Sequence, residues 1–437
     1  MREKDTFLVS RTKAILGIQF VLSVLLILMP YSSSLNQLVQ MGIMALSALF
    51  YVYEPVSAVS SILMFNILPT TVNTATSSGN TEGVYYLGYN LSWLLLFVLV
   101  VLYLLMHRNE LVIRRHKWRC IGFGVYMLIS GLWASNTTYY SDSFFLLIGI
   151  YVLFPLFINS KEDVRFVWNT FILASVILTV QMVLYTLRSG TIQESGSLIN
   201  SNYLSLTTMI MLTLNLSCLL DNREYLSKGF KTLLGLLIGC SAFLLISYAS
   251  RTAFLILIAY ILMIIAMLIK ENRKALIGLI CTTVIAVILI FSLGIYEYLA
   301  STFFEDNFET GNGRTLLWAQ YLREFSNENI VLKIFGRGFH IFRAQFLSYK
   351  IFAHNSYLSI LIDFGLVGLL LFATNIISCV QKMAKMKQYS MAIAAFAIGI
   401  YLIAIDGYQD SLFATYFAFI TAYASYLPAE LAVENKR

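Results

Sequence analysis

Two arginines and a histidine stand at the starts of apolar or amphipathic segments, where they could act on a charged substrate. Arg251 lies in a short break between two apolar runs, Arg314 follows a Gly-Asn-Gly turn, and His354 precedes another apolar run. A guanidinium can hold a phosphate through two parallel hydrogen bonds. A neutral imidazole can accept a proton as a general base. Together the three residues favour chemistry on a phosphate-bearing substrate.

Each of these residues also has a structural interpretation, and the residue types alone leave both open. Arg251 could extend to lipid headgroups, as long basic side chains do at a membrane edge. Arg314 could be a solvated loop residue, although it opens an amphipathic stretch where the helix dipole disfavours a cation and favours a bound anion. His354 could cap a neighbouring helix.

The rest of the chain predicts a membrane protein. Of its 437 residues, 59% are hydrophobic and 12% charged, about half the charged fraction of a soluble globular protein. Apolar runs of about 18 residues recur along the chain, a length that crosses a bilayer as a helix. Lipid offers no partners for backbone groups, and these runs lack the alternation of a β-barrel. We therefore predict an all-α polytopic transmembrane helix bundle.

The hydropathy pattern predicts about 12–14 spans. Residues 1–294 hold the first eleven, 295–353 form a large extracytoplasmic loop with a small helical cap, and 354–437 hold the last three. The fourteen segments are roughly 14–30, 36–53, 56–70, 88–106, 120–134, 143–159, 166–187, 200–220, 232–249, 252–269, 275–294, 354–379, 389–406 and 411–428.

The basic residues predict the orientation. If the N-terminus is cytoplasmic, the inner loops and tails hold 22 of the 30 Lys and Arg residues. Positive charge marks cytoplasmic loops. We therefore expect cytoplasmic N- and C-termini, and we expect Arg251, Arg314 and His354 on the outer side of the membrane.

Two glycines and an aspartate follow His354 at suggestive spacings. In a continuous helix, Gly365 and Gly368 would return to within about 40° of His354, which predicts a face where helices pack closely. Asp363 would lie on the opposite face and would need a partner inside the bundle, because an ionised side chain is costly there.

Other candidates are weaker. Gly336, Arg337 and Gly338 form a tight basic turn that could approach a ligand, and Asn202 could line an outer mouth or cap a helix. Asp406 and Asp410 flank a short predicted outer loop, where we expect them to be solvated. The five cysteines are scattered, and no Walker, dinucleotide or zinc motif occurs. We expect no metal, no cofactor and no nucleic acid partner.

The pattern resembles the O-antigen ligase and polymerase superfamily. His354-Asn355, nine residues, Gly365, two residues and Gly368 reproduce the spacing of its signature. Upstream elements occur in the family's order: Ser250-Arg251, Gly313-Arg314 with Trp318, Gly336-Arg337-Gly338, and more weakly Leu132-Trp133-Ala134-Ser135 and Asn202-Tyr203-Leu204. The specific part covers roughly residues 240–380.

The resemblance implies a metal-independent, inverting glycosyltransferase on the outer side of a bacterial cytoplasmic membrane. Its donor would be an undecaprenyl-diphosphate-linked oligosaccharide. Arg251 and Arg314 would hold the diphosphate, His354 would be the general base, and Asn202, Gly336, Arg337, Gly338 and Asn355 would line the substrate site. The lipid bilayer, a flippase and chain-length regulator proteins are the implied partners.

Three functions stay open within this interpretation. A polymerase of capsular, exopolysaccharide or O-antigen repeat units fits fourteen spans and a moderate outer loop best. A ligase would transfer finished glycan to a lipid or wall acceptor. A membrane transporter is the alternative of another class, but it predicts paired intramembrane charges and two matching halves, which the sequence lacks.

Overall fold

The structure of the chain is a computed structural model. It describes residues 13–28, 34–51, 117–134, 142–189, 201–221, 226–247, 250–271, 314–339, 344–346, 349–351 and 353–426, with scattered helical positions between 56 and 106 and between 276 and 292. The predicted spans 56–70, 88–106 and 275–294, the first part of the predicted outer loop and both termini lie mostly or wholly outside the described residues.

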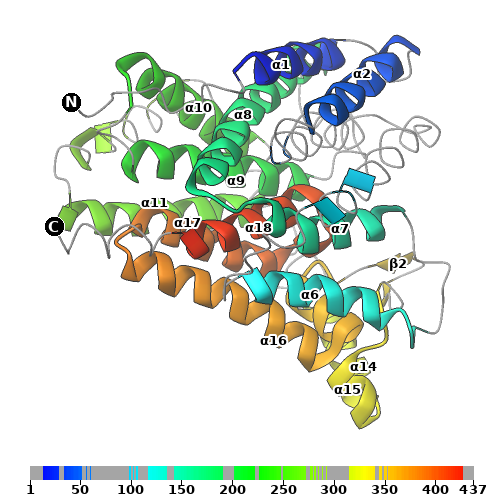
Figure 1. Cartoon of the computed structure of the whole chain (residues 1–437). Helices are drawn as coiled ribbons and strands as arrows, with labels where there is room; N and C mark the ends of the chain where they lie inside the picture. Colours follow the sequence, from blue (N-terminus) through cyan, green and yellow to red (C-terminus); the bar gives the residue numbers. More distant parts are fainter. Residues whose placement is uncertain are drawn as a thin grey trace, which may run out of the picture.

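The described chain is almost entirely helical (Figure 1). The predicted spans that fall in it coincide with helices to within two turns. These helices are α1 (Lys13–Leu28), α2 (Ser34–Tyr51), α6 (Lys117–Ser130), α7 (Asp142–Phe157), α8 (Lys161–Ser189), α9 (Ser201–Asp221), α10 (Lys228–Ser247), α11 (Arg251–Glu271), α16 (Ser356–Lys385), α17 (Tyr389–Tyr401) and α18 (Ser411–Tyr426).

Five of the described helical segments are long and apolar enough to cross a membrane. They are Lys161–Val180, Leu204–Asp221, Lys228–Ile246, Arg251–Lys270 and Ser356–Lys385, and Leu38–Leu49, Leu147–Phe157 and Tyr389–Ala404 are shorter apolar helices. The all-α bundle of membrane helices is thus confirmed. The number of spans and the division at residues 295 and 354 stay predictions.

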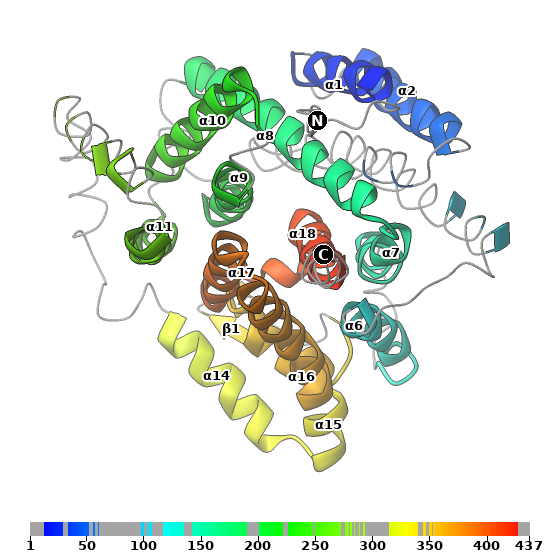
Figure 2. The ribbon, with the colours of Figure 1, turned by 60° about the vertical axis from the view of Figure 1, so that its left-hand side comes forward.

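Helix α18 forms the centre of the bundle (Figure 2). It contacts α6, α7, α8, α9 and α16, and its residues 412–425 are all buried. A helix that is apolar all round belongs in an interior. Its alternating alanines and aromatic rings allow close packing: Phe417 stacks on Phe372 with ring centroids 5.0 Å apart. The Asn375 amide donates to the Thr421 hydroxyl at 2.8 Å, a polar contact that joins helices in an apolar medium.

Helix α16 is interrupted at Gly365, where φ is 62° and ψ is −167°. The break frees the carbonyls of Ile362 and Asp363, which a regular helix would pair with N–H groups four residues on. The N–H of Arg337 donates to Ile362 at 3.0 Å, and the N–H of Gly338 donates to Asp363 at 2.8 Å. The Gly-Arg-Gly turn therefore completes the hydrogen bonding of α16.

This crossing requires glycine on both sides. Gly336 has φ of 77°, and a Cβ there would collide with the Asp363 carbonyl, while a Cβ on Gly365 would collide with the Ile334 carbonyl. Two backbones can approach this closely only where neither residue has a side chain.

The prediction that Gly365 and Gly368 share a continuous helical face with His354 is therefore wrong. Rotation at 100° per residue does not carry across the break at Gly365, and His354 precedes the helix, which begins at Ser356. Gly368 leaves room for the Phe364 side chain, which a Cβ would strike, and it lies near Tyr126 of α6. Close packing at these glycines thus arises from the broken geometry of α16.

The predicted cap contains two helices and a short hairpin. α14 (Arg314–Asn327) and α15 (Ile330–Phe335) lie against α16, and β1 (Ala344–Phe346) pairs antiparallel with β2 (Tyr349–Ile351). The hairpin was not predicted. Two indoles attach the cap to the bundle: Trp318 donates to the carbonyl of Ala353 at 2.9 Å, and Trp133 donates to that of Gly336 at 3.1 Å.

Gly365→Ala should destabilise the protein strongly. The substitution forces an alanine to a positive φ and drives its Cβ into the Ile334 carbonyl, which together should cost about 3 kcal/mol or more. Thermal unfolding of the protein in detergent measures the effect. Gly239→Ala is the matched control, because a Cβ on Gly239 of α10 meets nothing within 4 Å. Equal melting temperatures for the two variants would contradict the crossing.

Candidate functional site

A buried carboxylate fixes the backbone at His354. The N–H of His354 donates to Asp406 Oδ2 at 2.7 Å, and the N–H of Asn355 donates to Asp406 Oδ1 at 3.3 Å. His354 has φ of 48°, a left-handed conformation that costs a non-glycine residue about 1–2 kcal/mol. Such strain persists only where surrounding contacts determine it, and it is concentrated at functional sites.

Asn355 then begins α16. As its N-cap, the Asn355 side chain accepts hydrogen bonds from the N–H groups of Tyr357 and Leu358 at 3.0 and 3.1 Å, as asparagine does at helix starts. Its amide is therefore engaged with the helix. A substrate contact of Asn355 stays a prediction.

Asp406 was expected to be solvated, and this expectation is wrong. Its side chain is 1% exposed, because residues 402–410 fold inward as two 3-10 turns, Leu402–Ala404 and Gly407–Gln409. Ser359 donates to Asp406 Oδ1 at 2.5 Å, and the N–H of Ser356 donates to the Ile405 carbonyl at 2.9 Å. The segment thus lies against the first turn of α16 and brings a carboxylate to His354.

Asp410 is buried as well, contrary to expectation. Its Oδ1 accepts a hydrogen bond from the N–H of Phe413 at 2.8 Å. Asp410 therefore caps the start of α18, and it has a structural role at the same end of the bundle.

Arg314 reaches the same place from the cap. It is the first residue of α14, and its guanidinium donates to the Thr252 hydroxyl at 3.3 Å. Thr252 directly follows Arg251, the first residue of α11. The two arginines proposed for the diphosphate therefore stand at the N-termini of two helices that meet here, where the helix dipoles add to their positive charge.

Asn202 joins a third helix to this group. Its Oδ1 accepts a hydrogen bond from the Ser250 hydroxyl at 3.0 Å, and its backbone carbonyl accepts one from the Tyr401 hydroxyl at 3.2 Å. Asn202 thus connects α9 to the start of α11 and the end of α17. Its side chain bonds across helices instead of capping its own, and a substrate contact stays a prediction.

The electrostatics of the cluster favour a neutral histidine. Burial lowers the pKa of His354, the charge of Arg314 lowers it further, and Asp406 opposes both. Burial also lowers the pKa of Arg314, against Tyr401 and Asp406, but a guanidinium stays charged at any physiological pH.

The hydrogen bonds of Asp406 fit its ionised form. Burial raises the pKa of Asp406, whereas the Ser359 hydroxyl, His354 when it is protonated, and the two backbone N–H groups oppose the rise. Backbone amides can only donate, and one points at each oxygen. The carboxylate therefore faces the site as an acceptor.

The Gly336-Arg337-Gly338 turn makes contacts that hold the cap helices against α16. The Arg337 guanidinium pairs with Glu324 at 2.5 Å and also with Glu328, and the backbone of the turn pairs with α16 as described above. These contacts connect α14 to α15 and to the break in α16. No described contact joins Arg337 to His354, so a substrate contact of the turn stays a prediction.

Asp363 has the bundle partner that the sequence required. The Tyr408 hydroxyl donates to Asp363 Oδ2 at 2.6 Å, and the Tyr151 hydroxyl donates to the Tyr408 carbonyl at 2.8 Å. Through Tyr408, Asp363 thus fixes the position of the segment that also carries Asp406.

The elements that resembled a family signature therefore converge at one end of the bundle. Residues 236–373 match the family model described as O-antigen ligase. The match supports the O-antigen ligase and polymerase superfamily and indicates a membrane enzyme of the ligase or polymerase type. It covers about a third of the chain. No curated protein and no solved structure shows a significant match.

The matched O-antigen ligase region contains Arg251, Arg314 and His354, but the structure adds residues beyond its end. Asp406 and Tyr401 lie after residue 373, and sequence reasoning missed both. Asp406 was detectable as an acidic residue between two apolar runs, but its burial was not. Tyr401 gave no signal, because tyrosine at a span end is ordinary in membrane proteins.

No described group of three or more His, Cys, Asp or Glu residues could hold a metal ion. The cluster instead combines two guanidinium groups, one imidazole and one carboxylate. With His354 neutral, these described groups carry a net positive charge, which suits an anionic substrate. Independence from metals stays a prediction.

The pKa of His354 should lie below its ordinary value of 6.5. Replacement of the other three histidines by glutamine isolates His354 for NMR titration with labelled histidine. Arg314→Gln should raise this pKa, because a neighbouring cation disfavours the imidazolium and its removal relieves that effect. Arg323→Gln, at an exposed position on the same helix, should leave the pKa unchanged. A wild-type pKa above 6.5 would contradict the described environment.

Proposed function

We propose that this protein polymerises undecaprenyl-diphosphate-linked oligosaccharide repeat units on the outer side of a bacterial cytoplasmic membrane. The observation that carries the proposal is the cluster of Arg314, His354 and Asp406 beside the N-terminus of α11. It combines charge for a diphosphate with a neutral base, and it lies at the end of helices long enough to cross a membrane.

The described groups suit each step of the transfer. The acceptor hydroxyl attacks the anomeric carbon of the donor glycan and forms the new glycosidic bond. The bond from that carbon to the diphosphate oxygen breaks, and its electron pair leaves with undecaprenyl diphosphate. Attack opposite the leaving group inverts the anomeric carbon. Each cycle lengthens one lipid-linked glycan by one unit.

Arg251 and Arg314 act on the leaving group. Negative charge grows on the diphosphate as its bond to the sugar breaks, and fixed cations in a low-dielectric site stabilise that charge. Arg314 is half-buried and is held by Thr252, so it needs little reorganisation during the reaction. Fixed guanidinium charge can take the place of a divalent cation on the leaving diphosphate.

His354 accepts the proton of the acceptor hydroxyl. A base must be unprotonated to do so, and the lowered pKa of His354 keeps it unprotonated at neutral pH. The imidazolium formed in the step then lies beside the Asp406 carboxylate, which compensates its charge. Asp406 is thus a positioning residue that acts through His354.

A ligase is the second candidate, because the matched family model carries that description. Ligase and polymerase chemistry share the donor, the leaving group and the base, and they differ in the acceptor. The residues of the cluster serve both. The choice between them therefore depends on the acceptor, and it is made by experiment.

Purified protein should extend lipid-diphosphate-linked repeat units into a ladder without added metal. His354→Ala and Arg314→Ala should each lower the rate by about 100-fold or more, as expected for loss of a general base or of a charge-stabilising donor. Arg323→Ala, on the same helix as Arg314, should retain the wild-type rate. Gel analysis of the lipid-linked products measures chain length.

The outcomes separate the candidates. Transfer to an added lipid or wall acceptor without a ladder would assign a ligase. A ladder that survives His354→Ala would refute the general-base role. No transfer to any acceptor by a correctly folded protein would refute both functions.

Asp406→Asn should lower kcat strongly and should leave KM for the donor nearly unchanged. An asparagine presents one NH2 group to a pocket where both oxygens accept backbone N–H groups, so one amide loses its partner at a cost of about 1–3 kcal/mol. The strained backbone at His354 should then relax. A pure loss of thermal stability with unchanged kcat would contradict the positioning role.

A further inference from the structure

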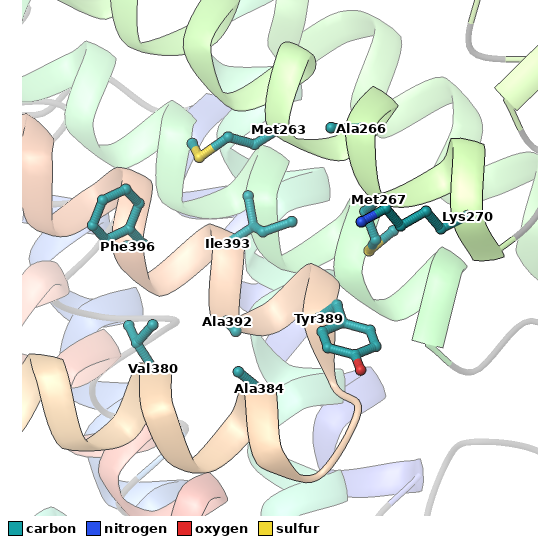
Figure 3. Close-up of a pocket in the computed structure, with 10 residues that line it drawn as sticks. All are labelled: Met263, Ala266, Met267, Lys270, Val380, Ala384, Tyr389, Ala392, Ile393 and Phe396. Carbon is teal, nitrogen blue, oxygen red and sulfur yellow. The ribbon is translucent and has the colours of Figure 1, made fainter.

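A groove lies between α11, α16 and α17 (Figure 3). It encloses about 570 Å³. On α11, the side chains of Leu255, Leu262 and Ile269 are each more than half exposed. Large apolar side chains stay exposed along a whole helix where the surroundings are hydrocarbon. The groove therefore opens into the membrane.

The groove has one polar and one apolar end. Lys270 and Tyr389 lie together at one end, and Met263 and Phe396 lie towards the other (Figure 3). On both α11 and α17 the two ends are seven residues apart, which is about 10 Å along a helix. This gradient matches an amphiphile with a charged head and an apolar chain.

The floor and walls suit a thin, flexible chain. Ala266 of α11, Ala384 of α16 and Ala392 of α17 each contribute a small side chain to the groove. Met263 and Met267 form a wall of flexible thioethers that can adapt to a mobile ligand. The three alanines leave space for a ligand, and the methionine side chains can adjust their conformation to contact a chain of methylene groups.

The polar end lies opposite the candidate active site. α11 has 21 residues and rises roughly 30 Å, about the thickness of the hydrocarbon core. Arg251 begins this helix beside the His354 cluster, and Lys270 stands in its last turn. The Lys270 ammonium is therefore at the headgroup level of the other leaflet.

We propose that this groove binds an anionic glycerophospholipid of the leaflet opposite the candidate active site. The phosphate lies at the Lys270 ammonium, at the end of the groove that Tyr389 also lines, and one acyl chain lies over Ala266, Ala384 and Ala392. Positive charge at the mouth selects an anionic headgroup. The far end of a polyprenyl chain carries no charge to match Lys270. The proposal is independent of the proposed transfer reaction.

Native mass spectrometry of the purified full-length protein in a neutral detergent tests this site. Phosphatidylglycerol and phosphatidylcholine are added at equal concentration. Wild type should retain the anionic lipid at least fivefold over the zwitterionic one. Lys270→Gln should remove this preference, and Ala266→Trp, which fills the groove from an exposed position, should remove retention of both lipids.

Two matched variants separate the groove from the general surface. Lys228→Gln removes an exposed lysine at the same end of the bundle, and Leu262→Trp enlarges an exposed residue of α11 outside the groove. Both should behave as wild type. Equal retention of the two lipids, equal effects of Lys270→Gln and Lys228→Gln, or displacement of phosphatidylglycerol by undecaprenyl phosphate would each overturn the proposal. Thermal unfolding verifies that every variant is folded.

Discussion

The Asp406 carboxylate is buried among groups that can donate to it, and the geometry at His354 depends on this arrangement. A carboxylate taken out of water must recover its lost hydration through hydrogen bonds and charge. It does so with two backbone N–H groups and the Ser359 hydroxyl. These bonds hold His354 in its left-handed conformation, fix the start of α16 and place a counter-charge beside the imidazole. One interaction thus determines both a helix start and the proposed base.

A second constraint connects the cap to this helix. α16 is broken at Gly365, and the N–H groups that follow Gly336 pair with the carbonyls that the break exposes. Since unpaired backbone groups are costly at membrane depth, the break is stable only while the cap is in place. Trp318 attaches the same cap to the carbonyl just before His354. The position of Arg314 and the shape of α16 are therefore coupled through backbone contacts.

The sequence predicted the helices well, because the bilayer reduces the problem to length and hydropathy. Every predicted span in the described ranges has its helix. The predictions that were wrong concern segments whose backbone departs from a regular helix, which length and hydropathy do not describe. Because α16 breaks at Gly365, the predicted helical face that joins His354 to Gly365 and Gly368 does not exist. Asp406 was expected to be solvated because it flanks a short loop between two spans, but residues 402–410 fold inward and bury it. The strands Ala344–Phe346 and Tyr349–Ile351 do alternate apolar and polar residues, but three residues are too few for this pattern to predict a strand.

The sequence by itself determined that this protein belongs in a membrane, where its helices lie in the chain, and which residue types make up the candidate site. Arg251, Arg314 and His354 were identifiable because ionisable residues at or near membrane depth are costly and are therefore functional candidates. Only the tertiary structure decided which groups meet. Asp406 and Tyr401 are 52 and 47 residues beyond His354 in the chain, and they reach the cluster through the packing of α16 and α17. Contacts between residues so distant in sequence depend on helix packing and backbone breaks, which hydropathy does not encode.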